Sequence, residues 1–323
     1  MTVPFLKQNE LCHVLSVNDC RIFSDIKEED EHTQYLPGDP RIQLTDPNIG
    51  SRLQAEFVTE DLDKMAPHLW QMSTQSSSNI SPLTEQITRG RRLIVTENPG
   101  LHLVWIHDRV FLKPLPEYLF SHAFWEYYLV SSHSPIEAPF RQMLLKAMCG
   151  FLRTYSYLIQ HKSDFVMATG DDLQLIPKCI SYAQFVNFMN NCLIEDSSTS
   201  PRYQFGELRL TRLNFWCKIF LSKSSYHRAE WQYGAHFAQY YGPLLFIFAL
   251  VSLLTSAMQV VLAAQDMLQS DESWLTFAKV SRGFSVFTIF FVACTAATLL
   301  VVLTHMILQE FVFAVAHFIS RNQ

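Results

Sequence analysis

Glycine is scarce in this chain of 323 residues, and its spacing excludes several classes of enzyme. The ten glycines are never closer together than eight positions. A dinucleotide-binding fingerprint, a P-loop, a nucleophile elbow and the glycine loop of protein kinases all need glycines within roughly five positions of one another. The standard forms of these motifs are therefore excluded, and we predict no cofactor.

Metal-binding spacings are also missing. The chain has no Cys-x-x-Cys, no His-Glu-x-x-His and no two histidines three or four positions apart. Its seven cysteines are typical of free, mostly buried thiols in a reducing compartment. The one cluster to test for a metal is His102, His107 and Asp108, with His122 following, because neighbouring strands could bring two of these histidines together. Satisfied or exposed histidines are the alternative, which we favour.

The net charge of −5 is small, so we expect no nucleic-acid partner. The first fifteen residues contain no apolar segment of the kind found in secretory signal peptides. We therefore expect the N-terminal part to be made in the cytosol, where free thiols persist.

Two apolar runs, residues 244–264 and 284–308, contain no charged residue. Each is long enough to cross a bilayer as a helix, which needs about 20 apolar residues. With the polar loop between them, they predict a two-helix transmembrane hairpin over residues 240–319. The polar candidates inside it are Gln259 and His305, the second of which we place at the interface.

The second apolar run continues beyond residue 308. As one helix to residue 319 it would be about 54 Å long, more than the ~30 Å hydrocarbon core. Either its tail leaves the membrane near Glu310, or it is a long packed helix.

Basic residues flank the first run. Five lie between residues 209 and 228 with no acidic residue among them, whereas the loop between the runs has only Lys279 and Arg282. This bias predicts that both termini face the cytosol. The segment also has an apolar stripe, so we predict either a basic amphipathic helix on an anionic leaflet or a helix packed on the soluble domain. The five residues are Arg209, Arg212, Lys218, Lys223 and Arg228.

The predicted fold class is α+β and mostly helical, with a soluble domain ahead of the hairpin. Residues 1–50 carry an acidic run and turn-forming residues and are expected to be loosely ordered. Residues 51–204 form the cytosolic α+β domain, and residues 205–239 form the juxtamembrane region. Helical periodicity runs from 49 to 70, and mostly helical segments follow residue 116. Three short runs at 93–95, 101–106 and 110–112 predict a small antiparallel β-meander.

Few polar residues qualify as catalytic. His161 and Asp164 can share a helix face, although capping of the preceding helix by His161 and Lys162 is the favoured alternative. Glu207 lies in a segment dense in arginine and glutamate, residues 202–209, for which a structural ion-pair network is favoured. The weak catalytic candidates are thus His102, His107, His161, Asp164 and Glu207.

Seven segments form a recognisable series: GRRLIVTE at 90–97, LHLVW at 101–105, KPLPEYL at 113–119, FW at 124–125, HKSD at 161–164, RYQFGELRLTRLN at 202–214 and SAMQV at 256–260. This series resembles a fungal family of membrane-anchored proteins of unknown function. The matches run in order over roughly residues 50–310, and the turn at 98–100 departs from the family pattern. The resemblance implies a soluble domain with a membrane hairpin and an association with fungal secondary metabolism. Some members carry a subtilisin-like label, which this chain does not support because it lacks Gly-Thr-Ser.

The missing motifs favour a membrane-tethered accessory or interaction protein of unknown molecular activity. Its expected partners are the lipid bilayer with an anionic leaflet, other proteins, or a second copy of the chain. The alternative is an enzyme that acts on a lipid or a hydrophobic metabolite at the membrane surface. An apolar pocket in which two of the candidate residues converge would favour the enzyme.

Overall fold

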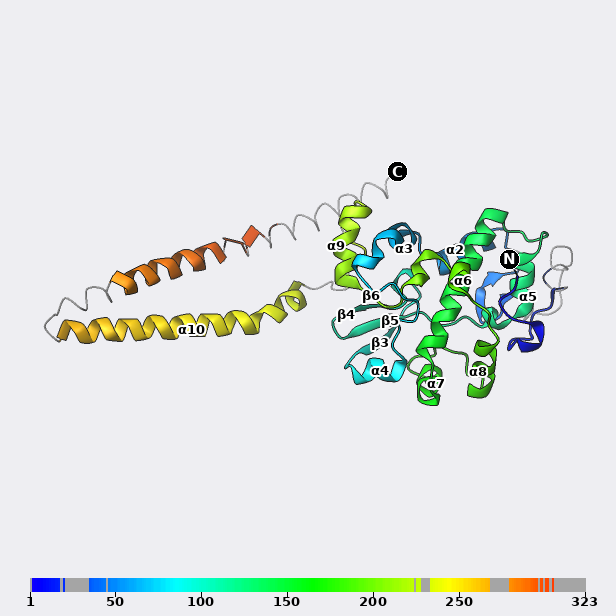
Figure 1. Cartoon of the computed structure of the whole chain (residues 1–323), viewed down its shortest axis with the longest axis horizontal. Helices are drawn as coiled ribbons and strands as arrows, with labels where there is room; N and C mark the ends of the chain where they lie inside the picture. The colour runs from blue at the N-terminus through cyan, green and yellow to red at the C-terminus, as the bar shows by residue number, and fades with distance from the viewer. Residues whose placement is uncertain are drawn as a thin grey trace. The chain divides into compact units, whose positions relative to one another are not determined.

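The computed structural model describes residues 2–17, 20, 35–44, 46–223, 225–227, 233–267, 279–295, 297–298, 300–301 and 304. The chain divides into two compact units, Met1–Ala229 and Glu230–Gln323. Figure 1 shows that the first unit combines helices with small sheets, and that the described part of the second is helical. The α+β, mostly helical prediction is therefore confirmed. The division falls near residue 230, so the predicted boundary at residue 205 lies inside the first unit.

The first unit is built from short elements around one long helix. Its strands are β1 (Tyr35–Leu36), β2 (Asp39–Gln43), β3 (Arg92–Val95), β4 (Val104–Ile106), β5 (Arg109–Leu112) and β6 (Leu208–Arg209). Its α-helices are α2 (Ile49–Phe57), α3 (Glu60–Met65), α4 (Leu83–Thr88), α5 (His122–Phe124), α6 (Ala138–Leu158), α7 (Lys162–Thr169), α8 (Tyr182–Asn190) and α9 (Leu210–Phe220). Short 3₁₀ turns join them at Lys7–Asn9, Ala66–Gln71, Pro99–Leu101, Glu117–Phe120, Asp196–Ser198 and Pro201–Gln204, and Trp125–Val130 forms a π-helix.

Two hydrophobic clusters explain why the predicted helix over residues 49–70 is broken. Ile49, Leu53 and Phe57 of α2 are buried in the larger cluster around α6. Leu62 and Met65 of α3 are instead buried in a second cluster with α9 and β4. Because one straight helix cannot bury its apolar stripe in two places, the chain turns at Val58, which is extended.

The main sheet is four-stranded and mixed, in the order β3-β5-β4-β6. β4 and β5 form the expected antiparallel hairpin, but β3 pairs with β5 in parallel, and β6 pairs with β4 in parallel. The predicted three-stranded antiparallel meander is therefore wrong. The reason lies in the turn after β3: Asn98 Oδ1 accepts the N–H of Gly100 at 2.9 Å and closes a 3₁₀ turn instead of a hairpin.

The same turn changes the middle strand. Leu103 has a φ of +60°, outside the strand region, so the strand begins only at Val104. Val104 and Ile106 are buried, and Trp105 is half-buried on the other face. The predicted strand over residues 101–106 is therefore reduced to its last three residues.

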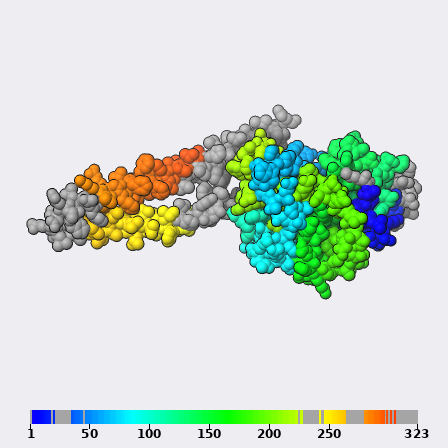
Figure 2. Space-filling model, in the orientation of Figure 1, coloured from blue at the N-terminus to red at the C-terminus, as the bar shows by residue number. Residues whose placement is uncertain are grey.

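The N-terminal segment is packed rather than loose where it is described. Phe5, Cys12 and Leu15 are buried in the larger cluster. The carbonyl of Pro4 accepts the N–H of Leu193 at 2.9 Å, and the rings of Phe5 and Phe188 lie 4.8 Å apart. Figure 2 shows these dark-blue residues against the green part of the first unit. The predicted acidic run, at 28–31, lies outside the described residues.

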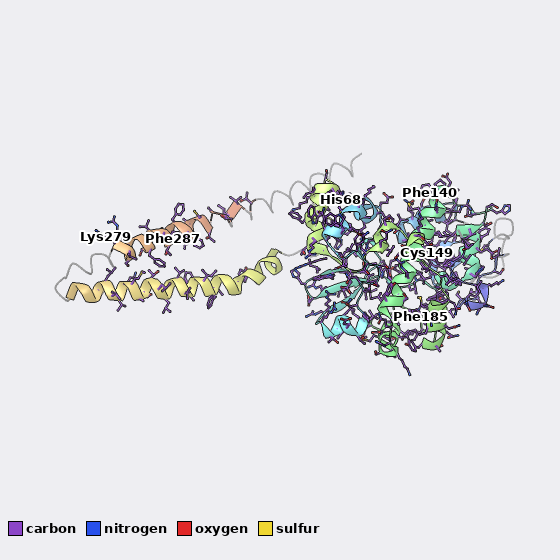
Figure 3. All side chains as sticks on the ribbon, viewed as in Figure 1. His68, Phe140, Cys149, Phe185, Lys279 and Phe287 are labelled. Atoms are coloured by element: carbon purple, nitrogen blue, oxygen red, sulfur yellow. The ribbon has the colours of Figure 1, made fainter. Side chains whose placement is uncertain are left out.

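Two cysteines in the interior of the first unit, Cys149 and Cys12, form no disulfide. Cys149, labelled in Figure 3, lies on the buried side of α6, and burial raises the pKa of its thiol to about 12. Burial likewise raises the pKa of Cys12 to about 11. Such thiols are protonated and unreactive at neutral pH.

The second unit contains α10 (Tyr233–Met267) and a further helical stretch over residues 279–295. Within the described residues, one helical segment is long and apolar enough to cross a membrane: Leu245–Ala263, 19 residues with a mean hydropathy of 2.3. None of its side chains is buried. The second predicted span, 284–308, extends beyond the described residues, so the two-helix hairpin stays a prediction.

Candidate functional site

His102 is a buried structural residue. Its Nδ1 accepts the backbone N–H of Lys113 at 3.1 Å, so its ring proton lies on Nε2, which donates to Thr154 Oγ1 at 2.8 Å. Burial, and then the positive charges of Arg202 and Lys113, lower the pKa of His102 well below its usual value. The neutral imidazole has both nitrogens engaged, so it has no free atom for proton transfer.

Asp164 is buried and joins two helices. Its Oδ2 accepts the backbone N–H groups of His161 at 2.8 Å and Gln160 at 3.2 Å, at the start of α7. Its Oδ1 accepts the N–H of Thr84 at 2.8 Å and the Thr84 hydroxyl at 2.7 Å, at the start of α4. His161 is the N-cap of α7, so the expected C-terminal capping of the preceding helix is wrong.

Glu207 makes a second set of contacts near α4. Its Oε1 accepts the N–H of Ser81 at 2.8 Å and the side-chain amide of Gln86 at 2.6 Å. Its Oε2 forms an ion pair of 2.6 Å with Arg91 Nη1. This is the structural ion-pair network that the sequence favoured, and both partners are mostly buried.

Both candidate carboxylates therefore hold the beginning of α4. Pro82 is the N-cap residue of this helix, and its side chain makes no cap hydrogen bond. The first N–H groups of α4 therefore need acceptors from elsewhere. Asp164 and Glu207 supply negative charge at that end, where the helix dipole favours it. His107 lies elsewhere, at the exposed β4–β5 turn with a φ of +50°. The candidates thus do not converge as an active site would require.

Replacing Asp164 with asparagine tests this capping role. We expect a loss of about 1.5–3 kcal/mol of unfolding free energy at pH 7, because hydrogen bonds to a charged acceptor contribute that much. Burial alone would raise the pKa of Asp164, but the hydrogen bonds from Thr84, His161 and Gln160 outweigh it and lower the pKa below the ordinary 3.8. The stabilisation is therefore present above that pH and is lost as the pH falls through the lower folded value.

The measurement is urea denaturation of both proteins from pH 7 to pH 3. The difference between wild type and Asp164→Asn should shrink toward the acid end. Asp172→Asn, at an exposed position after α7, is the control and should change stability by less than about 0.5 kcal/mol. A difference that does not depend on pH would contradict the charged-cap explanation.

Beside Glu207 lies a cavity of about 490 Å³ that sequence reasoning did not identify. Arg91, Arg209 and Arg212 line it together with Trp105 and Glu207. The guanidinium carbons of Arg91 and Arg209 lie 4.4 and 5.1 Å from the centre of the Trp105 ring. We call this the arginine cavity. Its lining residues come from four separate parts of the sequence, 70–79, 91, 105 and 207–212, so no local motif could have indicated it.

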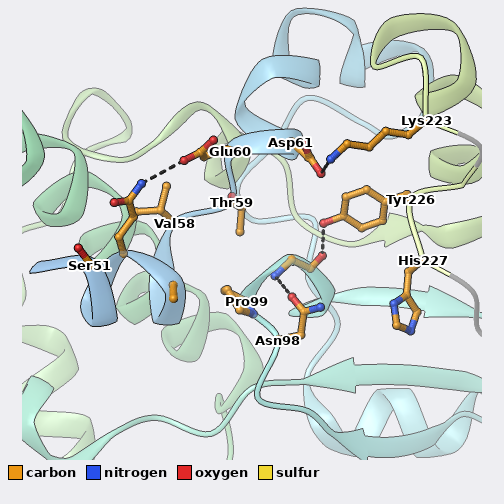
Figure 4. A pocket seen from close by; sticks show the side chains of 13 residues that line it. Ser51, Val58, Thr59, Glu60, Asp61, Asn98, Pro99, Lys223, Tyr226 and His227 are labelled. Carbon is orange, nitrogen blue, oxygen red and sulfur yellow. Dashed lines mark hydrogen bonds and ion pairs between the residues drawn. The ribbon is translucent and has the colours of Figure 1, made fainter. Parts of the chain in front are cut away.

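A second cavity, of about 540 Å³, lies between α2, α3, the 98–100 turn and residues 223–227 (Figure 4). Its walls are mostly paired: Lys223 and Asp61 form an ion pair of 2.6 Å, and the Tyr226 hydroxyl donates to the Gly100 carbonyl at 2.8 Å. The buried Thr59 hydroxyl has no partner in the described structure. This cavity is polar, and most of the polar groups named here bind one another.

The five basic residues predicted at the membrane surface have different surroundings. Arg209 and Arg212 line the arginine cavity, Lys218 is exposed on α9, and Lys223 is paired with Asp61. Arg228 lies outside the described residues. The predicted apolar stripe of α9, with Leu210, Leu213 and Cys217, is buried in the second cluster. The stripe is therefore covered by the rest of the first unit, on which α9 packs.

The intramembrane candidates are only partly visible. Gln259 is exposed on α10 inside the apolar segment Leu245–Ala263. His305 lies outside the described residues. In the described ranges, no group of three or more His, Cys, Asp or Glu side chains is arranged to hold a metal ion, so the cluster of His102, His107 and Asp108 is not assembled there.

Residues 49–292 match DUF6601, a family of unknown function. The chain belongs to the DUF6601 family. No curated protein and no solved structure matches it.

The DUF6601 match begins at the first residue of α2 and ends in the second apolar run. It includes the arginine cavity, the α4 caps and the apolar segment of α10. It leaves out the N-terminal residues that pack on the first unit. The DUF6601 match thus covers most of the first unit together with the membrane-length helix.

Proposed function

We propose that this protein is a membrane-tethered accessory or interaction protein, in which α10 anchors the folded first unit to a bilayer. The observation that carries the proposal is the segment Leu245–Ala263, whose 19 residues have a mean hydropathy of 2.3 and no buried side chain. Exposing such a surface to water is unfavourable by about 25 cal/mol per Å² of apolar area. A bilayer removes that cost.

The two-span form of the anchor is part of the proposal. The run at 284–308 would return the chain across the membrane, and the basic flank at 209–228 would keep the first unit and the C-terminus in the cytosol. Lys279, labelled in Figure 3, lies near the start of the second helical stretch. The loop at 265–282 would then face the other side.

The enzyme alternative gains no support from its candidate residues. His102 has both ring nitrogens engaged, Asp164 caps α4, and Glu207 is engaged by Ser81, Gln86 and Arg91. A catalytic role needs groups that remain available to a substrate. We therefore propose binding or tethering rather than chemistry, and we keep the fungal secondary-metabolite association as context for the partner search.

Glycosylation mapping tests the anchor. A glycine–serine insert with an Asn-x-Ser acceptor, placed at residue 270 of the full chain, should be glycosylated in microsomes. Added protease should digest the first unit. Replacing both Leu250 and Leu254 with arginine should abolish the glycan, because each arginine at the centre of a span costs about 3 kcal/mol.

The matched control replaces the same two leucines with alanine, which shortens the side chains without adding charge. That protein should keep the glycan. An unglycosylated wild-type insert, or a first unit protected from protease, would overturn the proposed topology. Retention of the glycan in the double arginine variant would overturn the assignment of residues 245–263 as a span.

A further inference from the structure

The arginine cavity carries positive charge that the protein does not balance. Three arginines line it, but its one carboxylate, Glu207, is already paired with Arg91 and accepts two further hydrogen bonds. In the part of the chain that the structure describes, neither Arg209 nor Arg212 has a carboxylate partner. The cavity therefore has a surplus of two positive charges.

Contacts within the first unit hold these arginines at the cavity. Arg209 lies over the Trp105 ring at 5.1 Å, and Arg212 Nη1 donates to the carbonyl of Met72 at 2.6 Å. A guanidinium has five N–H donors, so both side chains keep donors for a ligand. Such forks match the oxygens of a phosphate group, which they bind in pairs.

The start of α9 adds to the same preference. Arg209 is the N-cap residue of this 11-residue helix, no side chain caps it, and its first turn has no acidic residue. Helix N-termini normally attract negative charge, because the dipole and the orphan N–H groups favour it. Here the sequence adds two cations at that end instead, an arrangement that an anion would stabilise.

Exposed apolar side chains occur at this positive site and further along α9. Trp70, which lines the cavity, is 61% exposed. Phe215 and Ile219, one and two turns beyond Arg212 on α9, are 60% and 58% exposed. Tryptophan together with basic residues is typical of the membrane interface, where rings lie at headgroup depth and cations meet lipid phosphates.

We propose that the arginine cavity binds the phosphate of an anionic lipid headgroup through Arg209 and Arg212. A volume of about 490 Å³ is within the usual range of ligand sites and can hold a headgroup. The choice of a lipid rather than a free phosphate rests on the proposed membrane tethering and on the apolar rim. The surplus of positive charge in the cavity depends neither on the membrane tethering nor on the apolar rim.

Calorimetric titration of the full chain in a neutral detergent tests the site. The ligands are dihexanoyl phosphatidic acid, dihexanoyl phosphatidylcholine and inorganic phosphate. We expect phosphatidic acid to bind more tightly than the other two. Arg209→Ala and Arg212→Ala should each weaken that binding about tenfold or more, because charge-assisted bonds to phosphate are about twice as strong as neutral ones.

Two further variants distinguish binding in the arginine cavity from a general attraction of the anionic lipid to surface cations. Lys218→Ala removes one exposed cation from the same helix but outside the cavity, and should change the affinity by less than about twofold. Arg209→Lys keeps the charge and loses the fork, so its affinity should fall between wild type and Arg209→Ala. Circular dichroism confirms that each variant is folded.

The outcomes are distinct. Equal losses in Lys218→Ala and Arg209→Ala would mean diffuse surface attraction and would overturn the cavity site. Inorganic phosphate binding as tightly as phosphatidic acid would overturn the lipid assignment. No binding of any ligand would overturn the site altogether, while the glycosylation test would still report on the membrane anchor independently.

Discussion

Replacement of Arg202 with methionine should destabilise the first unit by about 3–5 kcal/mol, one of the two largest effects we expect. The side chain is only 1% exposed. Its Nη1 donates to the carbonyls of Phe205 at 2.8 Å and Gly206 at 3.1 Å, and its Nη2 donates to the carbonyl of His102 at 3.2 Å. Burial lowers the pKa of Arg202, but a guanidinium stays protonated at neutral pH.

Methionine fills much of the same space but donates no hydrogen bond. Three buried carbonyls would then lose a charged donor, and each unsatisfied group costs about 1–3 kcal/mol. The carbonyl of His102 lies just before β4, and those of Phe205 and Gly206 lie just before β6. We therefore expect the loss to appear first as weaker pairing of these two strands.

Hydrogen exchange of the full chain in detergent measures this effect. The slowest amides of α6 report global opening of the first unit, and they should exchange faster in Arg202→Met. Arg89→Met is the control, since Arg89 is half exposed and makes only an i,i+4 ion pair with Glu85. Its effect should stay within about 0.5 kcal/mol. Equal exchange rates in the two variants would contradict the stabilising role assigned to the hydrogen bonds of Arg202.

Replacement of Gly206 with alanine should have a comparable effect through sterics alone. An added Cβ would lie 2.0 Å from the carbonyl oxygen of Asn79 and 3.0 Å from the side chain of Ile80. The backbone there cannot shift freely, because Gly206 N donates to Ser76 O at 3.0 Å and Glu207 N donates to Asn79 O at 2.9 Å. Overpacking of this kind costs about 3 kcal/mol at the upper end of its usual range.

Gly50→Ala is the matched control for this glycine. It makes the same chemical change in α2, where the new Cβ would meet Ile136 at an ordinary 3.4 Å. Because alanine favours helix over glycine, stability should stay the same or rise by up to about 1 kcal/mol. Thermal unfolding of both proteins gives the comparison. If Gly206→Ala melts at the wild-type temperature, the close approach of the two segments is wrong.

The sequence predicted the general plan because that plan follows from periodicity and composition. Long apolar runs, helical spacing and the β4–β5 hairpin are local patterns, and each can be identified within a short window. The meander failed for a local reason as well. The Asn98 cap and the positive φ of Leu103 redirect the chain, and neither is visible from alternation of apolar residues alone.

The candidate site could not be predicted because its contacts are distant in sequence. Asp164 reaches Thr84 across 80 positions, and Glu207 reaches Ser81 across 126. The sequence identified both carboxylates as polar candidates in charged segments, but it did not indicate which groups they contact. Trp105 lies in a run that the sequence predicted to be a strand, but only the pairing of β4 with β6 brings Arg209 onto its ring.

Because β6 pairs with β4, the main sheet can be completed only late in the synthesis of the first unit. The sheet is incomplete until Leu208 has been synthesised, because its N–H bonds to the carbonyl of Leu103. The apolar segment starts at Leu245, so it follows within roughly 2–7 s at ordinary rates of translation. If α10 is the membrane anchor that we propose, the first unit can therefore add β6 to the sheet only shortly before the ribosome delivers α10 to a membrane. Slower translation between these two points should favour completion of the sheet before targeting.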